Sequence, residues 1–381
     1  MKRTMSLLLA LMLVFSLAAC SSPAPDNSPA ADTPAPADNT PADDNKTPEP
    51  AADDDNPLAG LAVKEDGTPY LLGYIFNETG SGWMSNNVGY VESLWKRAGG
   101  DFYSFCSDYD LNKEISAMDD LKQMSPDAIL VHPSDSSAIA PAVQSALDEG
   151  YPVFAVDMGV IGADPTSFVH ADQVEMGRAC GEYIVANFSE ENPAKVLEIT
   201  GGLQQDGAQQ RQRGFHEAIE GVSYIEIVQI IDGNWESDKA FDGVQDAFER
   251  NSDINVIYTH SDIMMQGIIE GLRVKGLLVP RGEEGHITIC SIDGDQTGMQ
   301  GIRDGYVDAI AENNPVMHAA VVINAILAYL HGENVEADYM LEVPVITADN
   351  VEDAQWWANL PVGEFDNWPV MEQDFCPVPS K

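Results

Sequence analysis

Short apolar runs alternate with longer stretches of helical periodicity along most of the chain. The apolar runs are rich in branched and aromatic residues, which is typical of buried β-strands. Strands are expected at 70–76, 101–106, 128–132, 152–156 and 167–171, and again at 195–200, 224–231, 254–260, 286–292 and 307–312. Helices are expected at 173–187, 208–219, 261–275 and 315–331. This alternation predicts an α/β fold with parallel sheets.

The predicted strands fall into two similar series, which meet near residue 172. Together they are more than one parallel sheet usually holds, since sheets most often have about four to six strands. We therefore expect two doubly wound lobes, each a sheet covered by helices on both faces.

Isolated polar residues follow the predicted strands repeatedly. In open α/β sheets, ligands bind beyond the carboxyl ends of the strands, so polar residues at these positions predict a lined cleft. The residues concerned are Asn77, Glu78, His132, Asp157, Ser261, Asp262, Asp293 and Asn313.

The chemistry of this set suits a ligand with many hydroxyl groups. Carboxylates accept strong hydrogen bonds from hydroxyls, and the guanidinium of Arg211 can donate two bonds at once. The indoles of Trp83 and Trp235 can cover the C–H face of a sugar ring.

The stretch "ILVHPSDS" (129–136) contains the residue types of a catalytic triad. No G-x-S-x-G elbow is present, however, and Asp135 and Ser136 stand where they could cap the following helix, as Asp262 could cap another. The chain also lacks a phosphate-binding loop and a dinucleotide-binding motif, and "TGSGW" (79–83) is expected to be a flexible loop over the cleft. We expect no catalytic residue, no cofactor and no metal site.

The composition is strongly acidic. The 381 residues include 62 Asp and Glu against 19 Lys and Arg, for a net charge of −43. This charge argues against nucleic acid as a partner and against adsorption to an anionic membrane.

The first 20 residues have early basic residues, an apolar core and small residues before Cys20, which is the pattern of a secretory signal peptide. "LAAC" also resembles the lipobox of bacterial lipoproteins, which implies that Cys20 is acylated and becomes the mature N-terminus. Residues 21–65 are mostly Pro, Ala, Asp, Asn and Thr and are expected to form a disordered tether. Cys106, Cys180, Cys290 and Cys376 remain, and either disulfides or free thiols are compatible with the sequence.

Nine segments, in the same order, resemble the bacterial periplasmic sugar-binding proteins of the ribose-binding and galactofuranose-binding type. They are "SGW" (81–83), "HPSDSSAI" (132–139), "PVFAVD" (152–157), "ADQVEMGRACGEYI" (171–184), "RQRGF" (211–215), "YTHSDIMMQGI" (258–268), "SIDG" (291–294), "ENNP" (312–315) and "VITADNVED" (345–353).

This resemblance implies two Rossmann-like lobes joined by a three-segment hinge, which close on the ligand like a trap. Lobe one would hold residues 66–171 and 314–343, and lobe two residues 172–313 and 344–381. The resemblance also implies sugar contacts from His132, Asp157, Arg211, Ser261, Asp293 and Asn313, with Trp83 in a loop that supplies aromatic stacking.

The sequence departs from the family's ribose binders at three positions. Those proteins have Arg directly after the position of Asp157, where this chain has Met158, and Asn at the positions of His132 and Ser261. Losing the guanidinium removes a bidentate donor, which argues against ribose as the ligand. The segment 356–381 lies beyond the resemblance, and its tryptophans are expected to pack on a lobe surface.

We expect a solute-binding lipoprotein, held on the outer face of the cytoplasmic membrane only by its lipid anchor. It would capture a monosaccharide as a monomer and deliver it to an ABC permease. A sugar-sensing receptor subunit that passes its closed state to a membrane signalling partner is the alternative. A sugar-processing enzyme would need a positioned acid and base, and the sequence marks none.

Overall fold

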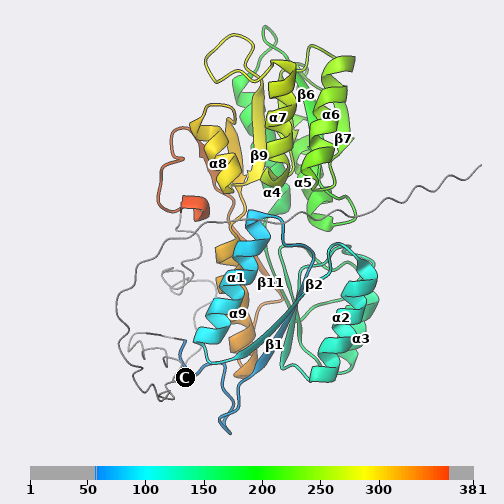
Figure 1. The fold of residues 1–381 in the computed structure, drawn as a ribbon, viewed down its shortest axis with the longest axis vertical. Coiled ribbons are helices and arrows are strands. Elements are labelled where there is room, and N and C mark those ends of the chain that lie inside the picture. Colours follow the sequence, from blue (N-terminus) through cyan, green and yellow to red (C-terminus); the bar gives the residue numbers. More distant parts are fainter. Residues whose placement is uncertain (1–55, 57, 360–381) are drawn as a thin grey trace, which may run out of the picture. The chain divides into compact units, whose positions relative to one another are not determined.

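The computed structural model describes residue 56 and residues 58–359, and its strands form two six-stranded sheets (Figure 1). The first sheet has the order β11-β5-β4-β3-β1-β2, and all of its strands are parallel. Its strands are β1 (Leu71–Phe76), β2 (Asp101–Cys106), β3 (Ala128–Val131), β4 (Val153–Val156), β5 (Ser167–Ala171) and β11 (Asp338–Leu341).

The second sheet has the order β12-β10-β9-β8-β6-β7, in which only β12 is antiparallel to its neighbour. Its strands are β6 (Ala194–Thr200), β7 (Ile225–Asp232), β8 (Val256–Thr259), β9 (Thr288–Asp293), β10 (Ala309–Glu312) and β12 (Val345–Thr347). The central strands β8, β9 and β10 are almost wholly buried, because helices cover both faces of the sheet.

Each sheet is packed between helices of its own. Helices on the first sheet are α1 (Gly82–Arg97), α2 (Leu111–Met124), α3 (Ala140–Asp148) and α9 (Pro315–Leu330). Helices on the second sheet are α4 (Gln173–Asn187), α5 (Asp206–Ile219), α6 (Ser237–Arg250), α7 (Met265–Lys275) and α8 (Gln296–Arg303). The described residues also include two short 3₁₀ helices, η1 (Asp262–Met264) and η2 (Trp357–Asn359). None of the helices in this part of the chain is long and apolar enough to span a bilayer.

The predicted fold class, two doubly wound α/β lobes, is confirmed, and all ten predicted strands are present. The edge strands β11 and β12 had no clear apolar pattern and were not predicted. The prediction of a flexible loop at 79–83 is wrong in part, because α1 begins at Gly82, with the Ser81 hydroxyl accepting from the backbone N–H of Met84. Trp83 therefore lies in the first turn of a helix.

The predicted N-caps are also wrong in detail. Helix α3 begins at Ala140 without a side-chain cap, and Asp135 accepts instead from the N–H groups of the preceding turn, those of residues 137 and 138. The Ser136 hydroxyl bonds to Asp206 of α5. The hydroxyl of Ser261, not the carboxylate of Asp262, caps η1.

Three segments of the chain pass from one sheet to the other. They lie between β5 and α4, between β10 and α9, and between β11 and β12. Two of them end in a capped helix, with Asp172 capping α4 and Asn314 capping α9. The N–H of Glu312 donates to the carbonyl of Pro344 at 2.9 Å, so two of the crossings lie side by side.

Helices α4 and α5 pack closely because each has a glycine at their contact. A Cβ on Gly177 would lie 1.9 Å from the carbonyl oxygen of Arg211, and one on Gly214 would lie 1.8 Å from that of Val174. Both distances are far below van der Waals contact, so the two backbones touch directly. This contact holds Arg211, on α5, in a fixed position relative to the sheet.

We expect Gly177→Ala to lower the free energy of unfolding by about 1–3 kcal/mol, because the added methyl group forces the two helices apart. Gly80→Ala is the control: the nearest atom to its added Cβ would be 3.5 Å away, and the free energy should change by less than about 0.5 kcal/mol. Urea denaturation followed by circular dichroism measures both. Equal unfolding midpoints for Gly177→Ala and the parent protein would show that the contact is not tight.

Candidate functional site

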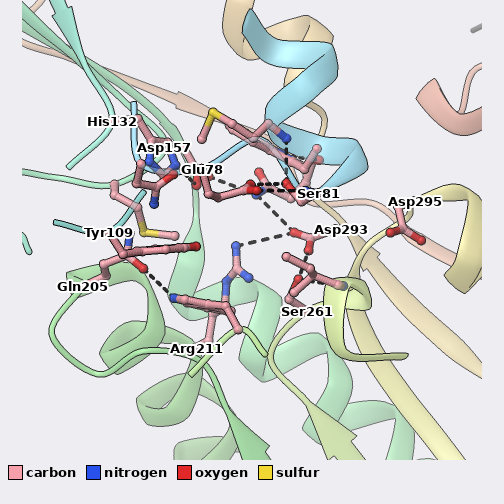
Figure 2. Close-up of a pocket in the computed structure, with 17 residues that line it drawn as sticks. Glu78, Ser81, Tyr109, His132, Asp157, Gln205, Arg211, Ser261, Asp293 and Asp295 are labelled. Atoms are coloured by element: carbon pink, nitrogen blue, oxygen red, sulfur yellow. Dashed lines mark hydrogen bonds and ion pairs between the residues drawn. The ribbon is translucent and has the colours of Figure 1, made fainter. Parts of the chain in front are cut away.

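A pocket lies at the carboxyl ends of strands from both sheets (Figure 2). The carboxyl ends of parallel strands meet at one edge of a sheet, which is why residues far apart in sequence converge here. Its lining residues are Asn77, Glu78, Ser81, Trp83, Met84, Tyr109, His132, Asp157, Met158, Gln205, Arg211, Trp235, Ser261, Ile263, Asp293, Asp295 and Asn313.

The eight residues that the sequence nominated for direct sugar contact all line this one pocket, as do Asn77 and Glu78, but Asp262, which was also expected in the cleft, does not. The first sheet contributes three of the eight and the second sheet five. The elements of the first sheet supply Trp83, His132 and Asp157. Those of the second sheet supply Arg211, Trp235, Ser261, Asp293 and Asn313.

Asp157 follows β4 and is buried in a set of donors. Its carboxylate bonds to Nε2 of His132 at 3.2 Å, to the side-chain amide of Gln173 at 3.1 Å and to that of Asn313 at 2.9 Å. Burial alone would raise the pKa of Asp157. The bond to His132 and the electrostatic influence of the nearby imidazoles and of Arg211 outweigh it, so the pKa lies below its usual range. Asp157 is therefore a charged acceptor at neutral pH.

Asp293 is the last residue of β9 and faces Asp157 across the pocket. Its carboxylate accepts from the Ser261 hydroxyl and lies 3.7 Å from the guanidinium of Arg211. Burial raises its pKa to about 7, although the charge of Arg211 and the bond from Ser261 act in the opposite direction. Asp157 and Asp293 thus differ in charge near neutral pH.

Asn313 joins the two carboxylates. Its Nδ2 donates to Oδ1 of Asp157 at 2.9 Å and to Oδ1 of Asp293 at 3.4 Å. Its backbone carbonyl accepts from the indole N–H of Trp83 at 2.9 Å. One buried residue, in the crossing between β10 and α9, therefore fixes two acids and an indole at the same time.

Arg211 is buried and held from three sides. Its Nε donates to Gln173 at 2.7 Å, its Nη1 donates to the carbonyl of His260 at 2.5 Å, and its guanidinium carbon lies 5.6 Å from the ring centre of Trp235. Stacking on the indole leaves the edge of the guanidinium that faces Asp293 as the part directed at the pocket. A guanidinium held in this way loses little freedom when it binds a ligand.

The two indoles have their N–H groups paired inside the protein. Trp83 donates to Asn313, and Trp235 donates to the side chain of Gln205 at 2.5 Å. A Cβ on Gly201 would lie 1.9 Å from the Trp235 ring, so glycine is required there for the ring to lie against the backbone. With the N–H groups used, these side chains offer a ligand the parts of their rings that line the pocket, since Gly201 and Arg211 already cover parts of the Trp235 indole.

Met158 lies in the pocket wall and is buried. A Cβ on Gly207, in α5, would lie 2.5 Å from its sulfur, so the thioether is packed against the first turn of that helix. The wall at this position is apolar and has no donor.

Sequence reasoning missed three polar lining residues, Tyr109, Gln205 and Asp295. Gln205 precedes α5 and could have been found from that position, because its predicted helix starts only a few residues later. Tyr109 belongs to the loop between β2 and α2 and adopts a φ of 56°, and no pattern in the sequence marks it.

The cysteines within the described residues, Cys106, Cys180 and Cys290, are free thiols. Cys376 and the predicted lipidation site Cys20 lie outside the described residues. No group of His, Cys, Asp and Glu side chains in residues 58–359 is arranged to hold a metal ion.

The segment after β12 lies closer to the pocket than predicted. Trp356 and Trp357 are buried, as expected for packing on a lobe, but the indole N–H of Trp357 also donates to the backbone carbonyl of Asp293 at 2.9 Å. The predicted surface role is therefore incomplete, because Trp357 supports a residue of the pocket.

Comparisons with known proteins place the chain among binding proteins. Residues 72–334 match the sequence model of the family described as periplasmic binding protein domain. The ribose import binding protein of Bacillus subtilis (strain 168) is 26% identical over 227 residues, which cover 60% of this chain and 70% of that protein. The galactofuranose-binding protein of Escherichia coli (strain K12) is 25% identical over 255 residues, which cover 65% and 79%.

Among solved structures, a crystal structure of a galactofuranose binding protein superposes with a TM-score of 0.70. The two sequences are 23% identical, and the match covers 74% of this chain and 96% of the other. At this identity the similarity supports the fold.

The raised pKa of Asp293 predicts a pH-dependent stability. The neutral acid is favoured in the folded protein, so the stabilisation from this group is complete below about pH 3.8 and is lost as the pH rises through about 7. The unfolding free energy of the parent protein, relative to that of Asp293→Asn, should fall by on the order of 3 kcal/mol between about pH 4.5 and 7.5. Urea denaturation across this range measures it. A difference that stays constant with pH would contradict the raised pKa.

Proposed function

Because the chain belongs to the periplasmic binding protein family, we propose that it is an extracytoplasmic solute-binding protein that captures a sugar between two lobes and delivers it to an ABC importer. The observation that carries the proposal is the single pocket in which a buried carboxylate from each sheet, a buried arginine and two indoles meet. The named relatives bind ribose and galactofuranose, and the pocket has the chemistry that such ligands require.

A sugar hydroxyl both donates and accepts hydrogen bonds, and this pocket offers partners for both. Asp157 accepts as a charged group, Arg211 donates, and Asp293 can do either because its pKa lies near 7. The indoles of Trp83 and Trp235 cover apolar C–H groups.

Capture requires the two lobes to move, and the three crossings are the segments that would absorb this motion. Hydrogen bonds join the two sides at the rim of the pocket. The hydroxyl of Ser136 bonds to Asp206, and the amide of Gln205 donates to the carbonyl of Pro133 at 2.8 Å. We expect these bonds to form on closure and to hold the sugar out of solvent.

The identity of the sugar depends on the wall formed by Met158. This residue takes the place of the arginine that the ribose-binding resemblance implies, and its packing against α5 leaves no donor there. We therefore expect a sugar other than ribose, one that presents C–H groups to this wall.

The difference in pKa between Asp157 and Asp293 would also suit a glycosidase acid and base. In this pocket, however, the Oδ1 atoms of both carboxylates accept from the same amide, that of Asn313. The second oxygens are engaged as well, Oδ2 of Asp157 with Nε2 of His132 and Oδ2 of Asp293 with the Ser261 hydroxyl, so we propose binding without chemistry. Release of nitrophenol from nitrophenyl glycosides would overturn this.

Delivery to an importer places the protein outside the cytoplasmic membrane. We propose a monomer that a lipid on Cys20 anchors to the outer face of this membrane, with the first part of segment 21–65 as its tether. The predicted tether is too long at its end, because Leu58, Leu61 and Ala62 are buried in the core beside the first sheet. The relatives named as import proteins favour delivery to an importer over the role of a sensor subunit.

Residues from both walls should contribute to affinity. A thermal-shift panel of pentoses, hexoses, polyols and nucleosides identifies the ligand, since a ligand at 100 times its Kd stabilises the fold by about 2.7 kcal/mol. Asp157→Ala, Asp293→Ala and Arg211→Ala should then each weaken binding by about 30- to 4,000-fold in calorimetry, because the groups that face them stay buried without a partner. His132→Asn should retain binding, because an amide can also donate, and His132→Leu should lose it.

Asp135→Ala is the matched control for these variants. Its carboxylate caps a turn outside the pocket, so we expect a loss of about 0.5–2 kcal/mol in stability and nearly unchanged affinity. Full binding by both Asp157→Ala and Asp293→Ala would remove the proposed site, and equal affinity for His132→Leu and the parent would give the histidine a structural role.

Lipid anchoring is tested separately from sugar binding. Expressed in a bacterial host, the protein should partition with membranes, and Cys20→Ala should release it, because no other part of the proposal attaches it to the bilayer. Intact-mass analysis of the mature protein should show an acylated N-terminal cysteine. Cleavage at another position without acylation would disprove the anchor.

A further inference from the structure

A second, partly open cavity of about 390 Å³ adjoins the pocket. The first sheet contributes the start of α1 to its lining, and the second contributes η1, α7, the start of α8 and Trp357. Its lining residues are Gly80, Ser81, Gly82, Ser85, Asn86, Asp262, Ile263, Gln266, Asp295, Gln296, Thr297 and Trp357.

The two cavities share part of their lining. Ser81, Ile263 and Asp295 belong to both. Figure 2 shows Ser81 and Asp295 on one side of the pocket, away from Tyr109 and Gln205. A group attached to a sugar in the pocket would therefore pass between Ser81 and Asp295 to reach the second cavity.

Four of the six amide and hydroxyl side chains that line the second cavity have hydrogen-bonding capacity that the protein does not use, and three of these four are exposed. The hydroxyls of Ser81 and Ser85 are engaged within the protein. Within the described residues, the side chains of Gln266, Gln296 and Thr297 have no hydrogen-bond partner. Asn86 donates to the carbonyl of Gly82 at 2.7 Å, which leaves its side-chain oxygen available. Amides and a hydroxyl with spare capacity are suitable partners for further sugar hydroxyls.

The two acidic side chains of the second cavity already have hydrogen-bond partners within the protein. Asp262 accepts from the backbone N–H groups of Gly294 and Asp295 and from the hydroxyl of Ser291, and Asp295 accepts from the N–H of Gly298. No Lys or Arg is among the described residues that line this cavity. A phosphate or a carboxylate would find no cationic side chain here, so the chemistry favours a neutral polyhydroxyl group.

We propose that the sugar held in the pocket is one unit of a two-unit saccharide or glycoside, whose second unit occupies this second cavity. The inference rests on the proposed function, and it assigns a ligand class larger than a monosaccharide. The first unit would bind to Asp157, Asp293 and Arg211, and the second would bind to Gln266, Gln296 and the other polar groups around them.

Matched saccharide pairs test the ligand class by calorimetry on the full chain. The pairs are D-fructose with sucrose, D-galactose with melibiose, and myo-inositol with galactinol. For at least one pair, the two-unit compound should bind at least as tightly as its single unit. If a single unit binds and every two-unit compound binds at least 30-fold more weakly, the inference fails while the proposed function stands. If no sugar or polyol binds, both fail.

Variants of the second cavity test its location. The double variant Gln266→Ala and Gln296→Ala should weaken the two-unit compound by about 3- to 10-fold per lost hydrogen bond and leave its single unit unchanged. Gln300→Ala is the matched control, since Gln300 is an exposed glutamine of the same helix α8 whose amide bonds to Asp304. Equal affinity for the two-unit compound in the double variant and in the control would show that the second unit lies elsewhere.

Discussion

The shared bond from the Asn313 amide to Asp157 and Asp293 is the interaction on which the site depends. The two carboxylates follow strands of different sheets, so this one nitrogen joins the carboxyl ends of both. A buried acceptor that loses its hydrogen-bond donor costs about 1–3 kcal/mol, so one amide that serves both acids stabilises the site at the point where they approach. The same residue lies in a crossing between the sheets, so the geometry of the site and the path of the chain are fixed together.

The partners of each acid then decide its charge. Asp157 is surrounded by donors and stays ionised, whereas Asp293, with fewer donors, has a pKa near 7. Both residues have a positive φ, 60° and 109°, which is costly for a side chain other than glycine and is found where function requires it. Trp357 holds the backbone of Asp293 in this conformation through its carbonyl. Strain and burial at these two residues are thus offset by bonds from elsewhere in the fold.

The sequence allowed the fold class and the location of the pocket to be predicted, because both follow from local patterns. Buried strands such as 128–131 are continuous apolar runs that can be recognised from the sequence alone. The residue after each parallel strand lies at the same edge of the sheet, whichever strands are its neighbours. What could not be predicted depends on contacts between distant segments. Asp262 resembles a cap but holds the loop after β9, Tyr109 reaches the pocket from a loop, and Trp357 approaches from beyond the last strand.

The central claim is that one sugar is bound by both lobes at once, and it is tested most directly by small-angle X-ray scattering with and without a saturating ligand. The account predicts a smaller radius of gyration in the presence of the ligand, because contacts from both lobes to the same molecule draw the two sheets together around the three crossings. Identical scattering curves, at a ligand concentration that calorimetry shows to be saturating, would contradict it.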